Sequence, residues 1–133
     1  MSTITLTKNA SVVVASSSNA AGATTRGTLD MRSAQGGIVT LQIQNGGTGP
    51  TAPGVCNILI AHDNGATPAA GSAGAVWKTL WSFAGGVAAN DTVTNSMEIS
   101  AAVQHLCIEF TGNTGQAVTV AASASVVTGG NVV

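Results

Sequence analysis

The stretch VTLQIQ, residues 39–44, decides the fold class, because apolar and polar residues alternate along it without a break. Successive side chains of a β-strand point to opposite faces, so this alternation gives one apolar and one polar face. Residues 92–99 repeat the pattern with Asn95 as the one polar residue on the apolar side, and residues 118–126 repeat it with small side chains on both faces. These three segments predict half-buried strands.

Working outward from these segments, turn-forming residues separate the remaining apolar runs. Gly, Pro, Asn and Asp punctuate a chain at turns. They mark a long loop over 45–54, a turn at 63–65 and a short hairpin connection at 112–115. Six further strands are expected near residues 3–7, 11–16, 24–32, 55–61, 75–83 and 104–111.

No segment of the chain carries a helical pattern. The Ala-rich residues 66–75 come nearest, but Pro68, Gly71 and Gly74 interrupt them, which predicts an exposed loop. Short strands with regular turns predict an all-β fold, a jelly-roll-like β-sandwich of about eight to nine strands, with a closed barrel as the alternative.

The chain is expected to fold as one domain over residues 1–133. A chain of this length buries roughly two-thirds of its unfolded surface when it folds, which is enough for a stable core without disulfides or a structural metal. No linker or long-period repeat divides it. Residues 1–10 and 127–133 are expected to form flexible arms.

Charge excludes some classes of partner. Charged residues are 7% of the chain, with a net charge of −1, against about 25% in a typical domain. Lys8, Arg26, Arg32 and Lys78 are scattered, so no basic footprint for nucleic acid exists. A net charge this close to zero gives little electrostatic repulsion between copies, which favours a protein that is part of an assembly. No apolar run approaches the roughly 20 residues of a membrane span, and no secretory signal is visible.

The cysteines and the candidate metal ligands indicate neither a disulfide nor a metal site. Cys56 and Cys107 are expected to stay reduced, because cytosolic thiols rarely pair. His105, Cys107 and Glu109 alternate along one strand and share a face, but ligands two residues apart on a flat strand do not chelate one ion readily. We expect no metal and no cofactor.

No catalytic constellation emerges from the sequence. His62 and Asp63 are adjacent, which does not suit a catalytic triad, and no Gly-x-Ser-x-Gly turn is present. The glycines of residues 46–49 lack the Lys-Ser/Thr ending of a phosphate cradle. We therefore expect no enzyme. A small hydrolase that uses His62 or His105 is the rival hypothesis.

The four aromatic residues are interpreted as core. Trp77, Trp81 and Phe83 share one face of a strand, and Phe110 lies on the apolar face of another. A core with so few aromatic residues needs their bulk. The alternative is a sugar-stacking platform.

Two features are candidates for an interface. Arg26, Asp30 and Arg32 share one face of the strand expected over 24–32, where they form either a cross-strand ion network or a contact that orients a partner. Val132 and Val133 follow a flexible Gly-Gly, so this tail either inserts into a neighbour or frays.

Four segments resemble small virion proteins of tailed bacteriophages. They are RGTLDMR (26–32), GGIVTL (36–41), NGGTGPT (45–51) and FTGNTGQAVTV (110–120). The likeness covers roughly residues 24–120 and consists of strand-and-turn patterns. It implies a jelly-roll-like capsid decoration or cement protein, bound outside an icosahedral head and clamping neighbouring major capsid subunits.

The sequence therefore predicts a structural virion protein, made and assembled in the host cytoplasm. Its expected partners are the major capsid protein and copies of itself, as a dimer or trimer. Head and tail locations both remain open. The alternative function is a carbohydrate-binding or tail-associated adhesion module, in which Trp77 or Trp81 is exposed.

Overall fold

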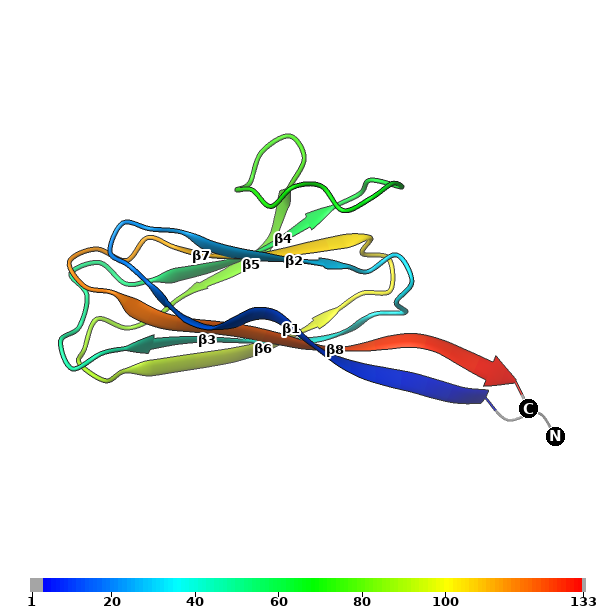
Figure 1. Cartoon of the computed structure of the whole chain (residues 1–133), viewed down its shortest axis with the longest axis horizontal. Helices are drawn as coiled ribbons and strands as arrows, with labels where there is room; N and C mark the ends of the chain where they lie inside the picture. Colours follow the sequence, from blue (N-terminus) through cyan, green and yellow to red (C-terminus); the bar gives the residue numbers. More distant parts are fainter. Residues whose placement is uncertain (1–3, 133) are drawn as a thin grey trace.

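The computed structural model describes residues 4–132 as eight strands in two packed layers (Figure 1). The strands are β1 (Ile4–Asn19), β2 (Thr25–Asp30), β3 (Gly37–Asn45), β4 (Val55–Ala61), β5 (Lys78–Ala84), β6 (Thr92–Ile99), β7 (His105–Thr111) and β8 (Val118–Val132). None of these residues forms a helix that is long and apolar enough to cross a membrane. The all-β prediction is confirmed.

The strand order is that of a jelly roll. Sheet 1 has the order β1-β8-β3-β6 and sheet 2 the order β2-β7-β4-β5, and every pair is antiparallel. Only the β4–β5 connection stays within one sheet. Each of the remaining connections between consecutive strands crosses from one sheet to the other. Two separate sheets with free edge strands exclude the closed barrel.

The main core lies between the sheets, where the alternating apolar residues meet. Val39, Leu41 and Ile43 of β3 are buried against residues of sheet 2 such as Ile58 and Phe110. The polar partners of the alternation face outward. The pattern that predicted strands thus also assigns the core faces of β3, β6 and β8.

The expected strands 3–7 and 11–16 are one strand. Lys8, Asn9 and Ala10 remain paired with β8 across the polar stretch that the sequence suggested as a break. Three register shifts along β1 let the long strand bend while it stays paired. Residues 4–132 therefore form eight strands.

The two arms expected at the chain ends pair with each other where they are described. Residues 4–8 and 127–132 form a two-stranded terminal ribbon that projects beyond one end of the sandwich (Figure 1). β3 pairs with β8 only as far as Val126. Val127 still bonds the backbone of Gln35 and Gly36, and beyond it the described part of the ribbon pairs with no further strand on either side.

The connection over 112–115 is not a hairpin. It carries the chain from β7 in sheet 2 to β8 in sheet 1, with φ of 90° at Gly112 and 80° at Gly115. The buried Asn113 side chain donates to the carbonyls of Asn19 and Gln116 and accepts from the Asn19 amide at 2.7 Å. These bonds tie this crossover to the end of β1.

A second, smaller core lies on the outer face of sheet 2. The segment 62–77 folds over that face and buries Trp77 against Leu59, Ala61 and Cys107. Most of residues 66–75 are exposed, as predicted for a loop, although parts of the loop are half-buried. Sheet 2 is therefore covered on both faces in this region.

Candidate functional site

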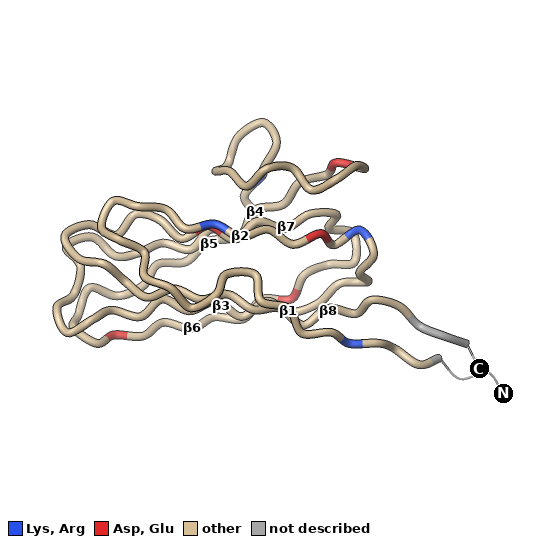
Figure 2. The backbone as a smooth tube through the Cα atoms, in the orientation of Figure 1, with Lys and Arg blue, Asp and Glu red and all other residues tan. Residues whose placement is uncertain are grey.

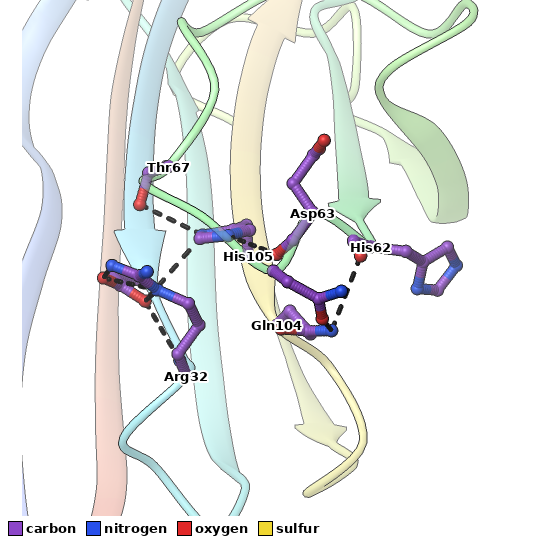
Figure 3. Close-up of polar contacts among 8 residues, drawn as sticks. Arg32, His62, Asp63, Thr67, Gln104 and His105 are labelled. Carbon is purple, nitrogen blue, oxygen red and sulfur yellow. Dashed lines mark hydrogen bonds and ion pairs between the residues drawn. The ribbon is translucent and has the colours of Figure 1, made fainter.

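His105, Cys107 and Glu109 share the outward face of β7, as the alternation predicts, but all three are buried there. His105 holds the covering loop, with Nε2 3.0 Å from the carbonyl oxygen of Asp63 and Nδ1 3.0 Å from the hydroxyl of Thr67 (Figure 3). A carbonyl oxygen only accepts, so Nε2 carries a proton. The imidazole thus fastens residues 63–67 onto sheet 2.

The two cysteines lie on opposite faces of sheet 2 and do not pair. Cys56 belongs to the main core, and burial raises the pKa of its thiol to about 12. Burial also raises the pKa of Cys107, whose thiol donates to the Gly71 carbonyl at 3.8 Å. Both thiols are protonated at neutral pH, which is the unreactive form.

Glu109 is the centre of a polar ladder across sheet 2. Arg26 of β2 donates through Nε to its carboxylate at 2.7 Å, and Asn57 of β4 donates to the other oxygen at 2.9 Å. Glu109 is only 4% exposed. The ladder thus satisfies a buried carboxylate and joins three adjacent strands.

Arg26, Asp30 and Arg32 do not form one cluster. Arg26 and Asp30 face outward on β2, but Arg32 lies beyond the end of that strand and turns back, placing its Nη2 2.6 Å from the Asp30 carboxylate. This guanidinium holds the pKa of Asp30 well below its usual range. The structure thus shows Arg26 paired with Glu109 and, separately, Asp30 paired with Arg32 and 3.8 Å from Nδ1 of His105. Charged residues elsewhere are scattered singly (Figure 2).

A bulge in β5 separates the aromatic residues. Ile58 pairs with Trp81 and Leu59 pairs with Thr79, so one extra residue, Leu80, lies between them. Trp77 consequently points to the outer side of sheet 2, into the second core, whereas Trp81 and Phe83 lie on the inner side. The prediction of one shared face is wrong.

Burial also distinguishes the aromatic residues. Phe110 and Trp77 are buried, and Phe83 is half-buried against the main core. Trp81 is 36% exposed on edge strand β5, so it is not a core residue. Its ring centroid lies 5.5 Å from that of Phe83.

His62 and Asp63 form no catalytic pair. Their side chains point away from each other at the start of the covering loop (Figure 3). Both are exposed, and they border a hollow of about 280 Å³ with Val76 and Lys78. Across residues 4–132, no group of three or more potential metal ligands gathers.

The outer face of sheet 1 is polar and nearly uncharged. We consider the outward positions of β3, of β6 and of the part of β8 that pairs with β3. Among these described positions, Glu98 is the one charged residue. The outward residues are Ile38, Thr40, Gln42, Gln44, Thr92, Thr94, Ser96, Glu98, Thr119, Ala121, Ser123 and Ser125. No carboxylate pair or cationic patch forms on this face.

A larger hollow, of about 680 Å³, lies at the base of the terminal ribbon. Gly36, Gly37 and Ile38 border it on one side, Glu98 on another and Val127 on the ribbon side. Gly36 has a φ of 84°, and its carbonyl accepts from the Val127 amide at 3.0 Å. The alternation of the sequence gives no sign of this hollow, because it depends on where β3 begins and β6 ends beside the longer β8.

Of the expected tail contacts, Val132 lies in β8 with its backbone opposite Ile4. Val133 lies outside the described residues. The interface residues expected from the sequence therefore occupy two distant regions, sheet 2 and the ribbon.

Comparison with known proteins gives no family for the chain. No protein-family profile matches it, and no curated protein matches it. Among solved structures, it is similar to a family 29 carbohydrate-binding module from Piromyces equi, at 12% identity and a TM-score of 0.44. The match covers 96% of this chain and 91% of that one. A likeness this weak assigns no role.

Proposed function

We propose that the protein is a structural virion protein that binds and stabilises a phage capsid through protein–protein contacts, without catalysis. The assignment to a phage rests on the sequence resemblance given above. The observation that carries a contact role is the terminal ribbon, a two-stranded projection with free edges beyond the jelly-roll body.

The ribbon supports this role because unpaired strand edges present backbone donors and acceptors. A neighbouring chain adds to such an edge as a further strand. Proteins that avoid such pairing protect their edges with charge or proline, yet residues 4–8 and 127–132 contain only Lys8 as a charged residue and no proline. The ribbon suits contact with a lattice neighbour, here a major capsid subunit.

The proposed mechanism is additive. Each bound copy contributes a modest interface, and a ligand that binds only the assembled shell shifts its equilibrium toward that state. Many copies across the seams of one shell multiply the effect. Shell disruption must then break these contacts as well.

Sedimentation with shells that lack the protein tests the proposal. We expect the purified protein to co-sediment with such shells and to raise their disruption temperature. Thr7→Asp, which places a charge on the ribbon, should weaken binding, while Thr79→Asp on exposed β5 is the matched control. Failure of the unaltered protein to co-sediment, with no change in disruption temperature, would overturn the proposal.

A carbohydrate-binding or adhesion module is the second candidate, and Trp81 is the observation that favours it. Its ring is partly exposed beside Phe83 at a sheet edge, where aromatic faces are available for stacking on sugars. Binding to a glycan array that is lost in Trp81→Ala and retained in Leu80→Ala would establish this alternative. No bound glycan across the array would exclude it.

A further inference from the structure

The hollow at the base of the terminal ribbon places an apolar and an acidic side chain together. Ile38 of β3 and Glu98 of β6 are direct cross-strand partners that both face outward. Side chains at such positions lie about 5 Å apart at their Cβ atoms. Ile38 is 53% exposed, and Glu98 has no ion-pair partner among residues 4–132.

The ribbon carries the complementary arrangement. At the nearby register shift Thr7 lies opposite Gly129 and Lys8 lies opposite Val127, so the extra residue is in β8. The alternation of β1 is therefore unbroken, and Leu6 and Lys8 point to the same face of that strand. Positions two apart on a strand are about 7 Å from each other. Leu6 is 51% exposed, and Lys8 has no ion-pair partner in the described chain.

These two arrangements do not meet within one molecule. β1 and β6 are the opposite edges of sheet 1, with β8 and β3 between them. Two strand spacings, about 9 Å, therefore separate β1 from β3, and three, about 14 Å, separate β1 from β6. The ribbon also leads away from the sandwich (Figure 1). Within a single chain, Leu6 and Ile38 both remain exposed to water.

We infer that the terminal ribbon of one copy lies across the hollow of a second copy, with Leu6 against Ile38 and Lys8 beside Glu98. The partner is a second copy of this chain, because the ribbon and the hollow match in both charge and apolar character. The chain has a net charge of only −1, so little general repulsion opposes the contact.

This inference goes beyond the proposed function, since it concerns contact between copies in solution. Its test uses purified protein without shells, so the two proposals fail separately. A protein that assembles but does not bind shells would contradict only the capsid proposal. A monomer that binds shells would contradict only the inference drawn from the hollow.

The first experiment reverses the charges at the contact and measures self-association by sedimentation velocity. The full chain should form an oligomer at micromolar concentration, more weakly as salt is added. Lys8→Glu and Glu98→Lys, each alone, should weaken association about tenfold or more, because like charges then face each other across the interface. The double variant should restore it.

Matched controls and a covalent test complete the design. Asp63→Lys and Lys78→Glu reverse exposed charges far from the contact and should leave association unchanged. A carbodiimide should join Lys8 of one copy to Glu98 of another by an amide bond with loss of water, identified by mass spectrometry on mixed isotope-labelled and unlabelled protein. A monomeric wild type, or a double variant that stays dissociated, would overturn the inference.

Discussion

Glu109 shows how one buried side chain depends on its neighbours. Its carboxylate is almost inaccessible to water and is bonded by Arg26 and Asn57. The sequence predicted its outward face but not its burial, because the alternation of β7 does not reveal what lies beside or above the strand. Pairing between distant strands decides that.

Removal of the Arg26 partner should therefore destabilise the fold. We expect Arg26→Ala to lower the free energy of unfolding by about 1–3 kcal/mol, because it leaves a buried carboxylate with one donor fewer. Urea denaturation measures the change. Arg32→Ala, which breaks only the exposed pair with Asp30, is the matched control and should change little; equal losses would contradict the ladder.

The Asp30–Arg32 pair should make stability depend on acid pH. The pKa of Asp30 is lowered in the folded protein, so its contribution is present above the ordinary aspartate pKa of about 3.9 and is lost as pH falls through the lower folded value. Because both side chains are partly exposed, unfolding of wild type and Asp30→Asn, compared from neutral to strongly acid pH, should show a small difference that shrinks only toward acid. A constant difference would contradict the pairing.

The two thiols should resist modification. Burial holds Cys56 at a pKa of about 12 and raises that of Cys107, so little thiolate exists at pH 8. A thiol reagent should label neither residue in the native protein and both after unfolding. Rapid native labelling of Cys107 would show that the covering loop opens readily.

At the scale of elements, β5 marks the limit of the alternation rule. Trp77, Thr79, Trp81 and Phe83 follow period two in sequence, yet the bulge at Leu80 places them on two sides of the sheet. A bulge is determined by the partner strand, here β4, so the local pattern does not reveal it. The same reason explains why 112–115 was interpreted as a hairpin, although β8 pairs with β1 and β3.

Single-tryptophan variants should separate the two environments. With Trp81→Phe, the remaining Trp77 emission should be blue-shifted and protected from acrylamide, because Trp77 is 2% exposed. With Trp77→Phe, the remaining Trp81 should be readily quenched. Trp77→Ala should also cost about 3 kcal/mol or more of stability, and similar quenching of both residues would contradict the second core.

At the scale of the whole molecule, the sequence predicted the fold class and the inner faces of three strands, because these follow from local periodicity. It predicted arms at the two chain ends, but not that residues 4–8 and 127–132 pair as one ribbon. The hollow beside Ile38 and Glu98 was missed, since residues 60 positions apart in sequence meet there only through sheet topology. Surfaces assembled by topology leave no periodic signal.

The central position of β8 in sheet 1 has a consequence for synthesis in the cell. β8 lies between β1 and β3, yet it is the last of the eight strands to leave the ribosome. Until it emerges, β1 lacks its neighbour in the sheet, and the apolar side chains of β3 that face sheet 2 are only partly enclosed. Because such long-range pairing is slow, the nascent polypeptide should rely on chaperones that shield it until β8 has emerged.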